Sequence, residues 1–136
     1  MIFELSGERF SRQIARAIKE RGKKKPIETT GELNEAISQA VPRNYERGRI
    51  DPATRTFQAL RIYANDELGN IERVLKNLPE ILKSGGRAVI VTFHSLEDRI
   101  VKNNFREMEK QNIVTVLTKK PIPSSADETR ENPRSR

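Results

Sequence analysis

The chain has 136 residues, of which 35% are hydrophobic and 33% charged, a composition typical of one soluble, helix-rich domain. It contains no cysteine, which excludes disulfides, thiolate zinc sites and cysteine nucleophiles. Its one histidine, His94, excludes histidine-rich metal sites, so we expect no metal site. No apolar run approaches the roughly 20 residues of a membrane span, so we expect no membrane contact and a cytoplasmic location.

The charge is +7 and is unevenly distributed. Residues 1–26 carry eight basic and three acidic side chains, and residues 43–61 carry five and two, whereas residues 62–118 carry eight of each. A basic first half joined to a neutral second half predicts a surface that faces a polyanion such as nucleic acid. The alternative interpretation is a thermally robust surface rich in Lys, Arg and Glu.

The first predicted element is an amphipathic helix from Ser6 to Gly22, with Phe10, Ile14 and Ile18 on its apolar side. A basic stripe lies opposite and leads into an exposed turn that ends at Pro26. Its members are Arg9, Arg12, Arg16, Lys19 and Lys23, followed by Lys24 and Lys25. Phosphates would relieve the repulsion among these cations, although a solvated face softened by Glu8 and Glu20 remains the alternative.

A second helix is predicted to begin at Thr29, because Thr29 and Glu32 match a capping box, and to stop at Pro42. The loop that follows combines Arg43, Arg47 and Arg49 with Tyr45. Arginine offers a fork of donors to phosphate and tyrosine offers a ring for base stacking. A single tyrosine leaves RNA contact in this loop open.

A third, long helical stretch is predicted to begin at Asp51, with Asp51 as N-cap and Pro52 in the first turn. Apolar residues then recur every three or four positions as far as Leu82. We expect Gly69 and Pro79 to bend or break this stretch, with Asp66 as a possible new cap. The pair Gly85–Gly86 is predicted to close it.

Two short apolar runs, Ala88–Phe93 and Ile113–Leu117, predict buried strands. A helix lies between them, with Ser95 as its predicted cap and Asp98 three residues later. The order strand, helix, strand favours a parallel crossover and therefore an α/β fold. The tail from Pro121 to Arg136 is rich in Pro, Ser and charge and is predicted to be irregular.

Candidate chemistry lies where the first predicted strand ends, because ligands bind beyond the carboxyl ends of parallel strands. His94 could accept a proton, and Glu97 or Asp98 could orient it or bind an amine, so these three are the candidate catalytic residues. Helix capping alone is the alternative explanation. No phosphate-cradling glycine loop is present, so spacing predicts no cofactor site in this chain.

Several long motifs resemble the MraW/RsmH family. They are PATRTFQALRI at 52–62, NDELG at 65–69, GGRAVIVTFHSLEDRIVK at 85–102, GERFSRQIARAI at 7–18, PIETT at 26–30, KKPI at 119–122 and RENPR at 130–134. The match covers nearly the whole chain. Asp51 stands where the family often has histidine, and an aspartate still caps a helix there. The resemblance implies a methyltransferase that modifies N4 of a cytosine in small-subunit ribosomal RNA, with S-adenosylmethionine as the donor.

The resemblance further implies that the chain is only the C-terminal part of such an enzyme. The family's donor-binding loop lies in its N-terminal half, so no cofactor-binding residue can be assigned here and we expect no donor binding by this chain alone. The implied fold is a partial Rossmann-like sheet of about two strands. The implied divisions are 1–50, part of a helical substrate-recognition insertion; 51–118, part of the methyltransferase domain; and 119–136, an irregular tail.

The expected partners are ribosomal RNA within the small subunit and the missing N-terminal half. Unpaired strand edges invite pairing, so the isolated chain is expected to self-associate or to need that half. The alternative functions are a non-catalytic fragment that binds RNA or a protein partner, and a structural remnant without activity.

Overall fold

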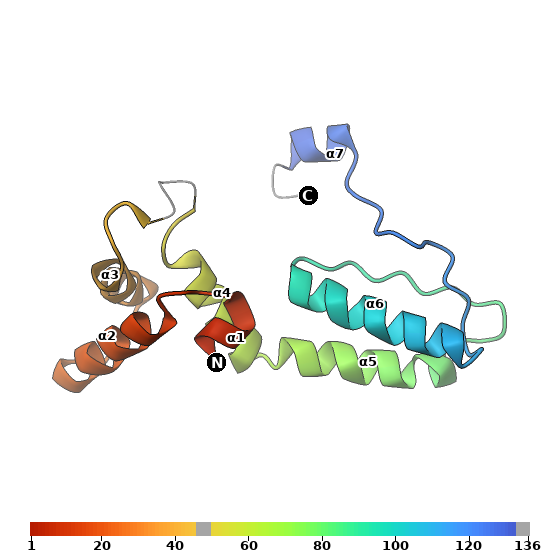
Figure 1. Ribbon diagram of the computed structural model, residues 1–136, viewed down its shortest axis with the longest axis horizontal. Helices are drawn as coiled ribbons and strands as arrows, with labels where there is room; N and C mark the ends of the chain where they lie inside the picture. Colours follow the sequence, from red (N-terminus) through yellow and green to blue (C-terminus); the bar gives the residue numbers. More distant parts are fainter. Residues whose placement is uncertain (46–49, 133–136) are drawn as a thin grey trace. The chain divides into compact units, whose positions relative to one another are not determined.

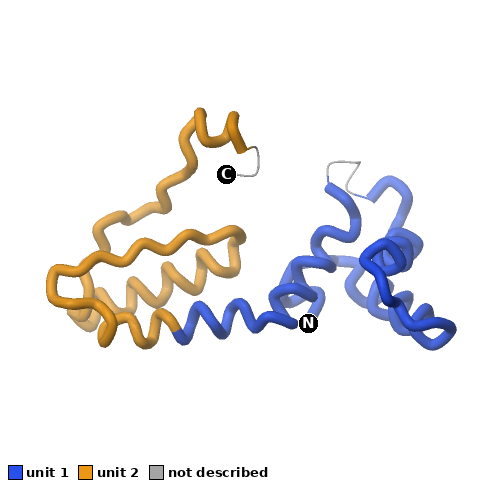
Figure 2. Tube along the Cα trace, turned by 180° about the vertical axis from the view of Figure 1, so that it is seen from behind, with its two compact units in different colours: residues 1–73 blue, residues 74–136 orange. Residues whose placement is uncertain are grey.

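The computed structural model describes residues 1–45 and 50–132, and in these residues all regular secondary structure is helical (Figure 1). The helices are α1 (Ile2–Ser6), α2 (Ser11–Lys24), α3 (Thr30–Ala40), α4 (Thr54–Ala64), α5 (Glu67–Ile81), α6 (Ser95–Lys110) and α7 (Ala126–Glu131). The chain forms two compact units, residues 1–73 and 74–136, which are coloured separately in Figure 2. No helix in the described residues is long and apolar enough to cross a membrane.

The predicted α/β fold is wrong for the described residues, because neither Ala88–Phe93 nor Ile113–Leu117 forms a strand. The first of these segments runs beside α6 without regular secondary structure (Figure 1). A strand requires a neighbouring strand to pair with its backbone N–H and C=O groups, and a helix cannot supply that ladder. The partial Rossmann-like sheet is therefore absent from the described part of the chain.

The segment nevertheless keeps the period of two expected of a strand. Val89, Val91 and Phe93 are 89%, 73% and 84% exposed, whereas Ile90 and Thr92 between them are half-buried. Alternate side chains of an extended chain point to opposite sides. One side therefore packs within its unit, and the other leaves a row of three apolar side chains in solvent, here called the apolar row (Val89, Val91 and Phe93).

The core of the first unit joins its four helices. Helix α1 packs against α4, and α2 packs against α3. The buried cluster consists of Ile2, Ile14, Ile37, Ala53 and Ala59. Ile14 and Ile37 are completely inaccessible, as expected for the apolar faces of amphipathic helices. This packing presents the opposite face of α2 to solvent.

The predicted helix Ser6–Gly22 is divided and shifted in the structure. Helix α1 ends at Ser6, and Gly7 adopts the left-handed conformation (φ +66°), which glycine adopts without steric cost. Helix α2 then continues through Gly22 to Lys24. It ends because Pro26 favours extended backbone at Lys25, whose φ is −154°.

The capping box that predicts α3 is confirmed. Thr29 Oγ1 accepts a hydrogen bond from the N–H of Glu32 at 3.1 Å, and Glu32 Oε2 accepts one from the N–H of Thr29 at 3.3 Å. The N–H of Glu28 also donates to Glu32, and this bond is the main reason why the pKa of Glu32 is lowered to about 2. The third contact, from Lys25 Nζ at 3.2 Å, ties the end of α2 to the start of α3.

The long helical stretch after Asp51 breaks between α4 and α5 at Asn65 and Asp66, where the sequence offers Asp66 as a new cap, and not at Gly69 or Pro79. Asp66 has a positive φ of +49°, which aspartate tolerates better than most residues. Gly69 lies inside α5, where a Cβ atom would come within 2.5 Å of the Asp66 carboxylate. Gly69 therefore accommodates the break by leaving room for that side chain.

The second unit buries Leu75 and Leu78 of α5 and Val101 and Met108 of α6. Helix α6 begins and ends close to its predicted bounds. Helix α7 lies within the tail for which composition indicates irregular structure. Its start is explained by a capping box between Ser125 and Glu128.

Candidate nucleic-acid interface

The predicted basic stripe is exposed on the face of α2 that points away from the core. Arg12, Arg16, Lys19 and Lys23 follow one another at spacings of three and four residues, so they lie along one side of the helix. Within the described residues, none of the four forms an ion pair. Lys24 is also exposed, and Arg9 stands just before the helix. The repulsion along this face is therefore not relieved by carboxylates of the described chain.

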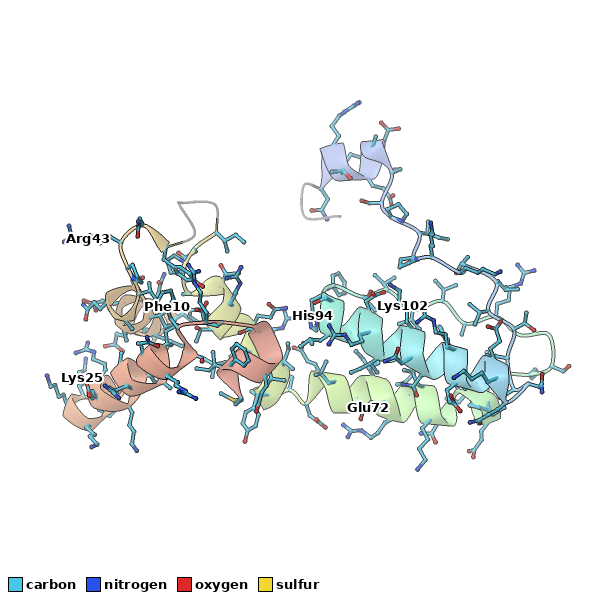
Figure 3. All side chains as sticks on the ribbon, in the orientation of Figure 1. Phe10, Lys25, Arg43, Glu72, His94 and Lys102 are labelled. Carbon is cyan, nitrogen blue, oxygen red and sulfur yellow. The ribbon has the colours of Figure 1, made fainter. Side chains whose placement is uncertain are left out.

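Several cations elsewhere in the chain are neutralised locally. Arg61 bonds to Glu67 at 2.8 Å, and Lys102 bonds to Asp98 at 2.7 Å. Lys25 is labelled in Figure 3 and belongs to the predicted phosphate-binding set. Unlike Arg12, Arg16, Lys19 and Lys23, it forms an ion pair, with Glu32 at 3.2 Å. Lys25 thus contributes less free charge to this face than its neighbours do.

The arginine-rich loop contributes one described cation. Arg43 is exposed on the loop after α3 and extends outward from it (Figure 3). Arg47 and Arg49 lie outside the described residues. Tyr45 is only 5% exposed, so its ring is not open for base stacking as the sequence suggested. The ring instead meets Phe10 edge to face, with centroids 4.9 Å apart and planes at 84°.

Tyr45 is held in this position by a buried carboxylate. Its hydroxyl lies 2.9 and 2.8 Å from the two oxygens of Glu8, which is completely inaccessible. Arg55 Nη1 donates to the same hydroxyl at 3.0 Å, and the N–H of Phe10 donates to Glu8 Oε1 at 2.7 Å. Burial, followed by the nearby Glu8, raises the pKa of Tyr45.

Sequence reasoning missed the role of Glu8, which it treated as a surface acid that softens the basic face. Glu8 and Tyr45 are 37 residues apart, and neither spacing nor composition connects them. The only signal in the sequence is a polar hydroxyl and a carboxylate near apolar helix faces. Without the tertiary packing, that signal does not distinguish a buried pair from two surface groups.

The candidate catalytic residues lie at the start of α6, where two of the three form the helix cap (Figure 3). His94, rather than Ser95, is the N-cap, and its Nδ1 accepts from the N–H of Glu97 at 3.4 Å. Glu97 Oε2 accepts from the N–H groups of Phe93 at 2.7 Å and of His94 at 3.3 Å. The capping alternative therefore explains this pair, with Glu97 in the place predicted for Asp98.

The remaining atoms of this pair still face each other. His94 Nε2 is 3.5 Å from Glu97 Oε1, and their side chains are 9% and 11% exposed. Among the described residues, His94 Nε2 has no hydrogen-bond partner. Asp98 is not part of this arrangement, because it pairs with Lys102 one turn later. Because Nδ1 accepts a hydrogen bond, the ring proton lies on Nε2, so this geometry offers an imidazole N–H that faces a carboxylate.

The described residues do not fit an adenosine-containing methyl donor. Gly85, with φ +77°, and Gly86, whose N–H donates to Lys83 O at 2.8 Å, form the turn after α5 and precede the extended segment. They are not a loop between a strand and a helix that could cradle a ligand. A groove between α2 and α3 is lined by Glu20, Arg21, Lys24, Glu35 and Gln39 and two alanines, with no ring to stack on an adenine.

The whole chain matches one family model, that of the MraW methylase family, over residues 1–136. The chain belongs to the MraW methylase family. The ribosomal RNA small subunit methyltransferase H of Synechocystis sp. is 54% identical over 136 residues, which are 100% of this chain and 43% of that protein. The proteins of the same name from Acidobacterium capsulatum and Persephonella marina are 52% and 48% identical, and the chain covers 44% and 46% of them.

The chain thus spans less than half the length of these MraW-family relatives, as the resemblance in the sequence implies.

The Glu8–Tyr45 pair generates a stability prediction. Tyr45→Phe removes the hydroxyl while keeping the ring, and leaves the buried carboxylate of Glu8 with the N–H of Phe10 but without its side-chain donor. We expect it to lower the free energy of unfolding by about 1–3 kcal/mol, measured by urea denaturation. Tyr63→Phe is the matched control, because Tyr63 is 69% exposed and its loss of a hydroxyl should leave stability unchanged. Equal stabilities of the two variants would contradict a structural role for the pair.

Proposed function

We propose that this chain is the RNA-contacting, C-terminal part of an S-adenosylmethionine-dependent methyltransferase that modifies N4 of a cytosine in 16S ribosomal RNA. The observation that carries the proposal is the match of all 136 residues to relatives named for methylation of small-subunit ribosomal RNA. In this proposal residues 1–50 belong to a helical substrate-recognition insertion, residues 51–118 to the methyltransferase domain, and residues 119–136 to a tail.

The donor in this proposal binds to the part of the protein that this chain lacks. S-adenosylmethionine supplies an electrophilic methyl group, and the described residues provide no pocket for it. In this proposal the chain alone is not catalytically competent. His94, Glu97 and Asp98 are proposed to lie near the cytosine in the complete protein. The N4 lone pair is delocalised into the ring, so a group that orients this nitrogen or accepts its proton favours transfer.

The RNA contacts are proposed to come from the basic residues of the first unit and its loop. Among residues 1–45 and 50–132, no carboxylate forms an ion pair with the cations of α2, and this supports the assignment, because RNA phosphates would supply negative charge there. The proposed set is Arg9, Arg12, Arg16, Lys19, Lys23, Lys24, Lys25, Arg43, Arg47 and Arg49. Ribosomal RNA within the small subunit is the proposed partner.

The second candidate function is a non-catalytic fragment that binds RNA or a protein partner. Two features of the described residues favour it: they expose a basic surface on α2, and they form no pocket that fits the methyl donor. The two candidates share RNA binding and differ in whether the chain works with a donor-binding part.

A further proposed contact is made by the apolar row. In the complete protein we place the rest of the family chain against Val89, Val91 and Phe93. In the isolated chain a second copy is proposed to cover them. The basis is exposed apolar surface rather than the strand edges expected from the sequence, because the described residues contain no strand.

The basic stripe generates a prediction about salt dependence. Arg12→Gln combined with Arg16→Gln is expected to weaken binding to single-stranded RNA. It should also reduce the slope of log K against log salt by about 1.4, since each lost phosphate contact removes about 0.7. Fluorescence anisotropy over a series of KCl concentrations measures both quantities. Lys76→Gln combined with Arg106→Gln is the control, because these exposed cations lie outside the proposed surface. An unchanged slope in the α2 variant would refute the assignment.

The apolar row generates a prediction about self-association. The apparent molecular mass of the chain in sedimentation equilibrium should rise with protein concentration. Val89→Thr combined with Val91→Thr should lower this apparent mass at the same concentration. Threonine keeps the shape of valine while adding a hydroxyl. Val74→Thr on α5 is the control, since Val74 is 54% exposed but outside the row. A monomer at every concentration, or equal effects of both changes, would contradict the contact.

A further inference from the structure

Arg9 differs from the other cations of the basic surface in how firmly it is positioned. It lies in the turn between α1 and α2. Hydrogen bonds between Glu8, which precedes Arg9, and the two residues that follow Arg9 fix the conformation of this turn. The N–H of Phe10 donates to Glu8 Oε1 at 2.7 Å, and the N–H of Ser11 donates to Glu8 O at 3.2 Å. Because both bonds span Arg9, its backbone has little freedom to reorient.

The side chain of Arg9 is held as well. Its guanidinium carbon lies 5.2 Å from the centroid of the Phe10 ring and 5.0 Å from that of Tyr45. The two rings are perpendicular to each other, and the Tyr45 hydroxyl is anchored on buried Glu8. The guanidinium therefore occupies a corner between two fixed rings, an arrangement that a cation–π attraction stabilises.

The donors of this guanidinium remain available. Arg9 is exposed and forms no ion pair within the described residues. A guanidinium over aromatic rings keeps N–H groups in its own plane, where they can form two parallel bonds to a phosphate. Arg12 is also exposed and unpaired, but it has no ring contact among the described residues.

We propose that Arg9 is an oriented phosphate contact, held in place by Phe10 and Tyr45, at which lysine cannot replace arginine. The proposal rests on the RNA-binding function proposed above and deepens it. The other cations of the stripe act through their charge, whereas Arg9 acts through the fixed plane and fork of its guanidinium. An ammonium group has the same charge but neither the fork nor the stacking plane.

The test compares two substitutions that preserve charge. Arg9→Lys is expected to weaken binding of the 136-residue chain to a labelled single-stranded RNA by about five- to tenfold, whereas Arg12→Lys changes it by less than about twofold. The salt slope should stay the same in both variants, because the number of charges is unchanged. Both residues are exposed, and circular dichroism checks that both variants fold.

A third variant, Arg9→Gln, removes the charge and should weaken binding further, with a slope lower by about 0.7. Equal affinities of Arg9→Lys and Arg12→Lys would overturn the proposal while leaving RNA binding intact. Absence of salt-dependent RNA binding by the unchanged chain would instead refute the proposed function, and this inference with it. The two failures are therefore distinguishable.

Discussion

The buried carboxylate of Glu8 is the constraint on which the arrangement of the first unit depends. A charge removed from water is costly unless hydrogen-bond donors surround it, so Tyr45 and the N–H of Phe10 must remain where they are. This requirement fixes the loop after α3 to the turn before α2. The same contacts bring two aromatic rings together beneath Arg9. A single interior group thus links the packing of the unit to the placement of its surface charge.

A different constraint governs the second unit. An extended apolar segment becomes a strand only when another strand forms hydrogen bonds with its backbone N–H and C=O groups. In the described residues, all regular secondary structure is helical. Val89, Val91 and Phe93 therefore keep the alternation of a strand while their side chains remain in solvent. The coverage of the relatives gives this exposure a simple interpretation, because more than half of each relative lies outside the matched region. This exposed row is the surface that we propose is covered by the rest of a longer family chain.

Local signals in the sequence predict where a helix begins when hydrogen bonds among a few neighbouring residues determine that position. The Thr29–Glu32 capping box is an example, because its hydrogen bonds join residues three apart. The start of α6 lies within one residue of its predicted position, because His94 and Glu97 form the cap instead of Ser95 and Asp98. Both pairs have the same spacing, and the choice between them depends on the backbone conformation at His94.

The features that could not be predicted depend on distant partners. Local sequence does not report whether Ala88–Phe93 has a strand beside it, so its β-type pattern predicts a strand that the described residues do not form. The pairing of Glu8 with Tyr45 likewise appears only when α2 and the loop after α3 are packed together. For the candidate site, the basic stripe was visible in the spacing of its residues. The burial of Tyr45, and the resulting orientation of Arg9, required the tertiary structure.

We propose that this chain carries the RNA-contacting portion of a MraW-family protein and that the methyl donor binds outside it. Isothermal titration of S-adenosylmethionine into the 136-residue chain tests it most directly. The account predicts only the heat of dilution at every donor concentration. A saturable heat with one donor bound per chain would contradict it.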